Sequence, residues 1–315
     1  MKNIIVGIHG LANKPQKRNL ATAWKTSIEE GLTRNLGLSN PKLNFVMVYW
    51  ADLLYKNPLH DDKNFDFDKL YNDEPYIKAK PGALIRHDEG WYDSVRASVT
   101  DVTGSVLDTV KGFKGTGAVA DWVLGKVLKD LAFYYDKNRR IKDRNNKNRL
   151  ARTVLMEELE KELIKQDSNR IMLISHSMGT IIAYDVLRDM GRINRKKNTN
   201  YQVPHFITIG SPLGIAHVKK KVYEERKYSK VRLRTPTIVS DRWVNYADRK
   251  DIVALDTHLG DDYGANRKGI TVEDDIVLND YVSPKGDSNH HKSYGYLRTP
   301  EISEHIAAFL QGKTK

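Results

Sequence analysis

The sequence predicts an α/β protein with a mostly parallel central sheet flanked by helices. Two observations lead to this prediction. Short apolar segments typical of buried strands alternate along the chain with amphipathic segments of helical period. Residues 171–184 also run from an apolar strand through a very tight turn directly into a helix. With 315 residues, of which 40% are hydrophobic, the chain is long enough for one large domain with a full core.

The expected elements follow one another in strand and helix order. Strands are predicted at residues 3–9, 43–50, 170–175, 204–210 and 238–246. Helices are predicted at residues 17–36, 178–190 and 301–310. The first helix has an apolar face whose members recur every four residues: Leu20, Trp24, Ile28 and Leu32. Such alternation favours a parallel sheet that helices cover on both faces.

Residues 52–148 interrupt the alternation and are predicted to be a helical and loop insertion that acts as a cap within a single domain of residues 1–315. Apolar residues recur at helical spacing on both sides of a glycine-rich break at residues 112–117: Val95, Val99, Val102, Val106 and Val110, then Val119, Val123, Val127 and Leu131. Such a helix pair suits a hairpin packed on the core or a mobile cap over an active site, and the two can coexist. Aspartates at positions 101, 108, 121 and 130 argue against a helix in a membrane interface.

Composition narrows the setting in which the chain is expected to work. Cysteine is absent, which excludes disulfides and thiolate catalysis and favours a reducing, cytoplasmic location. No apolar run approaches the length of about 18 residues that a membrane span needs. Residues 1–9 are interpreted as a buried first strand rather than a signal peptide, because the apolar run is short and His9 interrupts it.

The formal net charge of +12 raises the question of an anionic partner. The basic residues cluster at residues 137–152, 192–197 and 219–234, and none of these clusters follows a nucleic-acid-binding motif. Solvated surfaces are therefore favoured and no nucleic acid is expected, while peripheral contact with anionic lipid stays open. A favourable potential for acidic or phosphate-bearing substrates also stays open.

The sequence gives no sign of a metal site or a cofactor. Three acidic pairs lack histidines at ligand spacing and are expected in surface loops: residues 61–62, 261–262 and 274–275.

The tight turn at residues 175–179, Ser-His-Ser-Met-Gly, is the strongest chemical motif. A strand, a turn and a helix in this order lift the Ser177 hydroxyl clear of the backbone, and the helix N-terminus offers N–H groups to a developing oxyanion. Small residues are needed two positions before and after the serine, and here these are Ser175 and Gly179. The plainer interpretation is a serine that only caps a helix.

A nucleophilic serine needs a base and an acid that orients the base, in the chain order serine, acid, histidine. Asp251 follows the strand at residues 238–246 and precedes an apolar pair, and it is favoured over Asp248 as the acid. His291 lies in a loop just before the last helix and is favoured over its neighbour His290 as the base. Asp248 and His290 stay open as alternates.

Oxyanion donors are expected at two backbone positions. The first strand ends in His9-Gly10-Leu11, where the glycine lets the following backbone approach the serine. The N–H groups of Leu11 and Met178 are then the candidate donors, although a simple strand-ending turn would look the same. Residues 210–214, Gly-Ser-Pro-Leu-Gly, follow the next strand and are expected to border the same crevice.

Taken together, these motifs resemble those of the α/β-hydrolase superfamily, in particular its esterase and lipase members. The matching segments are residues 4–11, 175–179, 210–214, 251–253 and 291–297. The resemblance implies a Ser177 nucleophile, a His291 base, an Asp251 acid and an oxyanion hole formed by Leu11 and Met178. It further implies hydrolysis of a small ester or acyl substrate through an acyl-enzyme, without a cofactor.

Two features depart from the pattern, namely Ser175 in place of glycine and the polar insertion. The alternatives are a thioesterase, a phospholipase or lysophospholipase, and a non-catalytic binding protein with the same fold.

Overall fold

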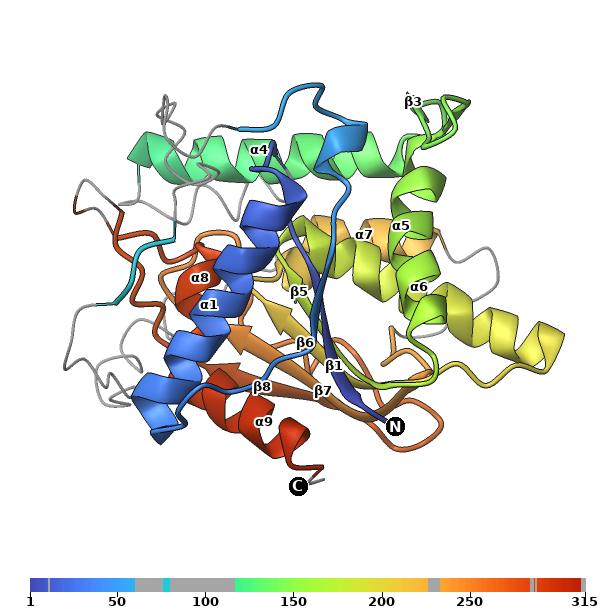
Figure 1. Cartoon of the computed structure of the whole chain (residues 1–315). Helices are drawn as coiled ribbons and strands as arrows, with labels where there is room; N and C mark the ends of the chain where they lie inside the picture. The colour runs from blue at the N-terminus through green and yellow to red at the C-terminus, as the bar shows by residue number, and fades with distance from the viewer. Residues whose placement is uncertain are drawn as a thin grey trace.

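In a computed structural model of the protein, a parallel sheet lies between two layers of helices (Figure 1). The structure describes residues 1–10, 12–59, 76–79, 117–225, 233–283, 286 and 288–312, with the backbone alone for residues 117–124 and 126.

The main sheet has six parallel strands among these residues, in the order β2-β1-β5-β6-β7-β8. The strands are β1 (Asn3–Ile8), β2 (Phe45–Val48), β5 (Arg170–His176), β6 (Val203–Ile209), β7 (Val239–Ala247) and β8 (Val272–Ile276). Strand β2 lies on one side of β1, and β5 to β8 follow one another on the other side. The direction in which strands are added therefore reverses between β1 and β5. In open α/β sheets, ligands bind beyond the carboxyl ends of the strands at such a reversal.

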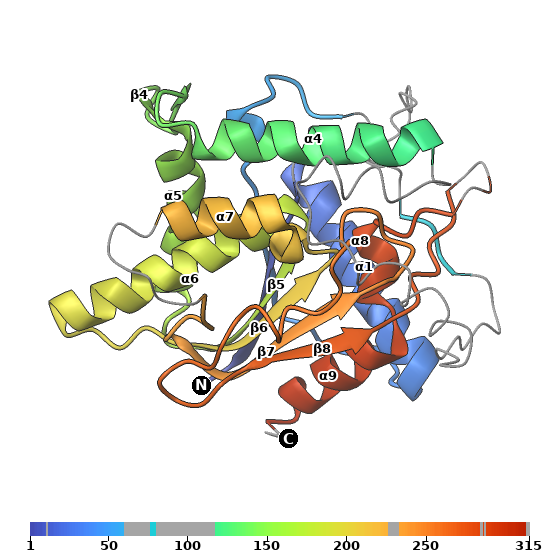
Figure 2. The same cartoon turned by 180° about the vertical axis from the view of Figure 1, so that it is seen from behind.

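Helices cover both faces of the sheet (Figures 1 and 2). One face is covered by α1 (Lys17–Leu36), α8 (Ser293–Leu297) and α9 (Pro300–Leu310). The other is covered by α4 (Gly117–Tyr135), α5 (Ala151–Lys165), α6 (Met178–Lys197) and α7 (Ala216–Glu224). Short 3-10 turns, η1 (Ala51–Leu53) and η3 (Pro212–Gly214), and an antiparallel hairpin of β3 (Arg140–Lys142) and β4 (Asn148–Leu150) complete the described elements.

The buried strands send alternate side chains into the two cores. Along β5, Leu173 packs with the α5 and α6 side, and its neighbours Met172 and Ile174 pack with the α1 and α9 side. Both faces of such a strand must be apolar, which explains the continuous apolar runs in the sequence. The α/β prediction is therefore confirmed.

The predicted strands and helices are found with small changes at their ends. Helix α1 spans the predicted residues and ends at Gly37, whose φ of 66° is a left-handed conformation that glycine adopts without strain. The four residues predicted to form its apolar face are all buried. Helix α6 runs on to Lys197, beyond the predicted residue 190.

The acidic pair at residues 274–275 does not lie in a loop, and that expectation was wrong. Both aspartates belong to strand β8 at the sheet edge. Asp274 accepts hydrogen bonds from the backbone N–H groups of Leu259 (2.8 Å) and Gly260 (2.7 Å) and from the side chain of Asn245 (3.0 Å). Its carboxylate therefore ties a loop to the sheet.

The predicted insertion is described only in part. Its first valine-rich stretch, residues 95–110, lies outside the described residues, as does nearly all of the glycine-rich break. The second stretch corresponds to α4, which runs across the top of the molecule in Figures 1 and 2. Val127 and Leu131 of α4 are buried in the core shared with α5 and α6.

A buried polar cluster fixes the C-terminal end of α4. The carboxylate of Asp185 on α6 is buried, and its Oδ2 accepts from the hydroxyls of Tyr134 (3.2 Å) and Tyr135 (3.1 Å). The same oxygen accepts from Arg152 of α5 at 2.8 Å. Because a buried carboxylate that lost these donors would be costly, this end of α4 is held firmly on α5 and α6.

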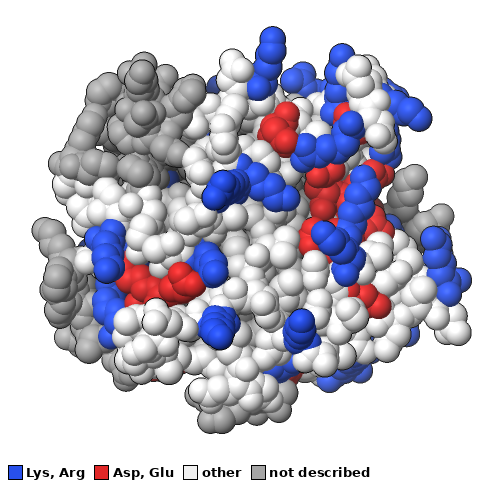
Figure 3. Space-filling model, in the orientation of Figure 1, with Lys and Arg blue, Asp and Glu red and all other residues white. Residues whose placement is uncertain are grey.

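The surface charge is mixed on the face that Figure 3 shows, where acidic side chains lie among the Lys and Arg side chains. In the basic cluster at residues 137–152, Arg144 pairs with Asp52 and Glu158, and Arg149 pairs with Glu157. Part of the positive charge is thus locally balanced. Within the described part of the chain, no helix is both long enough and apolar enough to cross a membrane.

Candidate active site

Ser177 lies at the turn between β5 and α6, at the carboxyl end of the central strands. Its φ of 54° and ψ of −130° are strained for a residue with a side chain. Its backbone N–H donates to the carbonyl of Ile209 at the end of β6 (3.2 Å), and its own carbonyl accepts from Thr180 (2.9 Å). These contacts hold the strained turn in place.

Two glycines allow the turn to pack against the end of β1. A Cβ atom at Gly179 would lie 2.6 Å from the carbonyl oxygen of His9, and one at Gly10 would lie 2.7 Å from Cβ of Ser177. No larger residue fits at either position without moving backbone. The close approach of the His9 backbone explains why the residue two positions after the serine has to be small, as expected from the sequence.

Ser175 replaces the usual first glycine of the motif without disturbing the turn. It is fully buried, and its hydroxyl donates to the carbonyl of Ile207 on β6 at 3.0 Å. The neighbouring strand therefore satisfies the extra hydroxyl group.

The structure brings Ser177, His291 and Asp251 into one chain of hydrogen bonds. Oγ of Ser177 lies 3.0 Å from Nε2 of His291. Nδ1 of His291 lies 2.9 Å from both carboxylate oxygens of Asp251. All three residues are buried, at 2–3% exposure. With Nδ1 donating to Asp251, the lone pair of Nε2 is directed at the serine hydroxyl and can accept its proton.

Two further donors hold the Asp251 carboxylate. The backbone N–H of Val253 donates to Oδ1 at 2.9 Å, and the hydroxyl of Tyr296 donates to Oδ2 at 2.8 Å. Burial, followed by the nearby Asp251 charge, raises the pKa of Tyr296 well above its usual value of 10.0. The phenol therefore stays protonated and donates to the carboxylate.

Gly210 lies directly against the Asp251–His291 pair. A Cβ atom there would lie 2.8 Å from Oδ2 of Asp251 and 3.1 Å from Nδ1 of His291. Its φ of 53° also favours glycine. The segment at residues 210–214 thus borders the site, as expected, and its first residue must be small.

The alternates Asp248 and His290 bind each other. Nδ1 of His290 lies 3.0 Å from Oδ2 of Asp248. The same oxygen accepts the backbone N–H of Asn279 at 2.8 Å, and Oδ1 accepts that of Lys250 at 2.8 Å. The structure therefore pairs the side chains of the two alternates with each other, and pairs Asp251 with the histidine that contacts Ser177.

His176 packs against His291 and binds its backbone. Its ring lies 4.7 Å from the ring of His291, and its Nε2 donates to the His291 carbonyl at 2.8 Å. Burial, and secondarily the proximity of His291, lowers the pKa of His176 well below 6.5. A neutral ring can pack against His291 without opposing a positive charge there.

The oxyanion donors expected from the sequence are described in part. Met178 is the first residue of α6, where a backbone N–H has no acceptor within the helix. Leu11 lies outside the described residues.

The ring of His9, at the end of β1, is fixed by two hydrogen bonds. Its Nδ1 donates to the Gly10 carbonyl (2.7 Å), and its Nε2 accepts the backbone N–H of Trp50 (3.2 Å). Burial, and then the charge of Lys14, lowers the pKa of His9 to about 3, so this ring is neutral.

Sequence reasoning missed the supporting residues His176 and Tyr296. His176 and Tyr296 lie within the motifs at residues 175–179 and 291–297. The local sequence around a tyrosine or a histidine does not show which distant residue its side chain will contact in the fold.

Among the described residues, no group of three or more His, Asp or Glu side chains could hold a metal ion.

Comparison with known proteins identifies the family. Residues 45–222 match the lecithin:cholesterol acyltransferase family. The match covers more than half of the chain and includes the Ser177 turn, and it ends before Asp251. No individually curated protein gives a significant match. The chain belongs to the lecithin:cholesterol acyltransferase family, whose members are lipid-ester hydrolases and acyltransferases, and it is an enzyme that acts on ester bonds.

Proposed function

We propose that this member of the lecithin:cholesterol acyltransferase family hydrolyses carboxylic esters of lipids through a Ser177–His291–Asp251 triad. The single observation that carries the proposal is the continuous contact from Oγ of Ser177 through His291 to Asp251. The strained turn under Ser177 and the glycine contacts around it give independent support, because such strain persists only where the surroundings enforce it.

The proposed reaction has two halves. His291 removes the hydroxyl proton of Ser177 as Oγ attacks the substrate carbonyl, and the protonated imidazole then gives that proton to the departing alcohol. An acyl-enzyme ester remains on Ser177. His291 next removes a proton from water, which attacks the ester, and returns the proton to Oγ as the carboxylic acid leaves.

Asp251 holds the ring of His291 and stabilises its positive charge in both halves of this reaction. The backbone N–H groups of Met178 and Leu11 are proposed to stabilise the oxyanion. For Met178, the support is its position at the N-terminus of α6.

Family membership favours a lipid ester over the other substrates that a triad accepts. The triad itself does not choose the leaving group, so a lysophospholipid and an acyl thioester are the alternatives to be compared with a simple ester. An alcohol that replaces water in the second half would make the reaction an acyl transfer.

Release of fatty acid and turnover of a p-nitrophenyl ester chain-length series test the proposal. Wild-type protein should turn over at least one ester, and Ser177→Ala should abolish turnover while the fold is retained. Ser27→Ala is the matched control, since Ser27 is a buried serine of α1 whose hydroxyl has no hydrogen-bond partner among the described residues. Equal activity of Ser177→Ala and wild type would refute the proposal.

A further inference from the structure

The loop that carries His291 is held by one buried side chain from another part of the fold. Asn279 lies a few residues after β8 and is 2% exposed. Its Nδ2 donates to the carbonyl oxygens of His290 and Lys292, both at 2.8 Å. These carbonyls belong to the residues immediately before and after His291. A single amide group therefore binds the backbone on both sides of the histidine.

Asn279 is itself fixed at its other polar groups. Its Oδ1 accepts the backbone N–H of Tyr281 at 3.1 Å, and its own backbone N–H donates to Oδ2 of Asp248 at 2.8 Å. Gly295 of α8 packs directly against the amide, because an added Cβ there would overlap Oδ1 of Asn279. The amide therefore has one orientation.

The Asp248–His290 pair adds a second attachment to the same loop. Oδ2 of Asp248 receives both the Asn279 N–H and Nδ1 of His290. The backbone N–H of Asp248 in turn donates to the hydroxyl oxygen of Tyr296 at 2.9 Å. Through Tyr296, this attachment reaches the carboxylate of Asp251.

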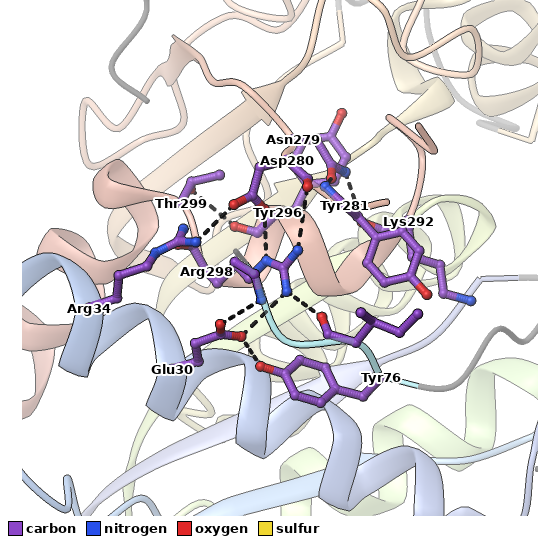
Figure 4. Close-up of polar contacts among 12 residues, drawn as sticks. Glu30, Arg34, Tyr76, Asn279, Asp280, Tyr281, Lys292, Tyr296, Arg298 and Thr299 are labelled. Atoms are coloured by element: carbon purple, nitrogen blue, oxygen red, sulfur yellow. Dashed lines mark hydrogen bonds and ion pairs between the residues drawn. The ribbon is translucent and has the colours of Figure 1, made fainter. Parts of the chain in front are cut away.

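The residue after Asn279, Asp280, is anchored towards helix α1 by two arginines, one of them the buried Arg298 (Figure 4). Arg298 is 1% exposed, and its Nε donates to Oδ1 of Asp280 at 2.7 Å. Arg34 of α1 pairs with the other oxygen of Asp280 at 2.8 Å. Arg298 also donates to the carbonyl of Ile77 at 2.5 Å and lies 3.4 Å from Glu30. Residues 279–280 are thus fixed between α1 and the His291 loop.

We infer that Asn279 is a positioning residue that sets the place of the His291 ring between Asp251 and Ser177. The inference rests on the proposed function. Proton transfer from Ser177 requires His291 to stay in line at hydrogen-bond distance, and misplacement by about 1 Å can cost on the order of 10²-fold in rate. The Nδ2 group sets that placement by fixing the peptide units on both sides of the histidine.

Asn279→Asp tests this role because it keeps the shape and replaces the two donors with an oxygen that faces two carbonyl oxygens. We expect kcat for a short ester to fall by about 10²-fold with KM little changed. Asn279→Ser, which removes the amide donors without adding a charge, should also lower kcat and keeps the test available if the aspartate variant does not fold.

Asn266→Asp is the matched control. Asn266 is a buried amide whose Nδ2 also donates to two backbone carbonyls, those of Pro236 (3.2 Å) and Val239 (2.9 Å), and neither acceptor belongs to the His291 loop. Its substitution should lower thermal stability and leave kcat per folded molecule unchanged. Wild-type kcat in folded Asn279→Asp, or an equal kcat loss in Asn266→Asp, would overturn the inference.

The two proposals fail in different ways. If wild-type protein does not react with a fluorophosphonate at Ser177, the proposed function fails. If wild-type Ser177 reacts and the Asn279 variants react at the same rate, only the positioning role fails.

Discussion

The hydroxyl of Tyr296 lies 2.8 Å from Oδ2 of Asp251 and donates a hydrogen bond to that carboxylate. His291 donates to the same oxygen at 2.9 Å. Tyr296 is fully buried and comes from α8, a short helix that begins two residues after His291. One short stretch of chain, residues 291–297, therefore supplies both the proposed base and the hydroxyl that binds the proposed acid.

Tyr296→Phe should lower kcat by about tenfold, because it removes one charge-assisted hydrogen bond from the carboxylate that orients His291. KM should change little. Tyr184→Phe is the matched control, since the hydroxyl of this buried tyrosine donates to the carbonyl of Arg234 at 2.9 Å, away from the triad. Equal kcat losses in the two variants would indicate a general packing effect.

Asp251→Asn should lower kcat on the order of 10⁴-fold, because an amide leaves His291 in the wrong tautomer. Asp248→Asn should cost much less, since Asp248 contacts His290 and Asn279 rather than the triad. By the same reasoning, His291→Ala should abolish turnover and His290→Ala should not. The reverse ranking in steady-state kinetics would move the triad to the alternates.

Gly210→Ala should lower kcat at least tenfold, because the new methyl group would push the Asp251–His291 pair apart. Gly37→Ala separates this effect from backbone strain. Gly37 also has a positive φ (66°), but a Cβ atom there would meet no atom within 4 Å. Both variants should lose stability in thermal unfolding, and only the first should lose activity. Unchanged kcat in folded Gly210→Ala would contradict the close approach.

We propose that the part of the insertion around residue 123 is a cap that sets acyl-chain selectivity. Val123→Trp should shift the p-nitrophenyl ester profile towards shorter chains. Leu131 of the same helix is fully buried in the core, so Leu131→Ala should cost about 3 kcal/mol of unfolding free energy and leave the profile unchanged. A Val123→Trp variant that loses stability with an unaltered profile would make the whole of α4 structural core.

Acid should destabilise the fold through buried histidines whose pKa is lowered, among them His205, His9 and His176. Burial lowers the pKa of His205 to about 4 and that of His9 to about 3, from 6.5 in an unfolded chain. Below pH 6.5 the unfolded chain binds protons at these rings that the folded protein does not bind. The free energy of unfolding should therefore fall as the pH falls, by about 3 kcal/mol for His205 alone between pH 7 and pH 4. Urea titrations across this range should show a shallower fall in His205→Gln; an identical slope would exclude His205 as a source.

Much of the fold could be predicted because local patterns match its elements. The apolar face of α1 and the glycine at its end, Gly37, are both visible in the sequence. Strand β8 could not be predicted in this way. It lies at the sheet edge with a single neighbour, and its central residue, Asp274, binds loop N–H groups, so it shows no apolar run.

The candidate site was predictable in residue type and order but not in its pairing. Two aspartates and two histidines each satisfied the chain-order rule, and the structure separates them by pairing His291 with Asp251 and His290 with Asp248. Tyr296 contacts Asp251, and Asn279 contacts Asp248, only because the fold brings together segments that are far apart in the sequence. A local pattern does not contain that information.

Active-site labelling of the folded wild-type protein with a fluorophosphonate, followed by mass spectrometry of its peptides, tests the central claim most directly. The proposed triad predicts a single phosphonylated residue, Ser177, with labelling lost in Ser177→Ala and strongly slowed in His291→Ala. Labelling at another serine, or no labelling of folded protein, would contradict the assignment of Ser177 as the nucleophile.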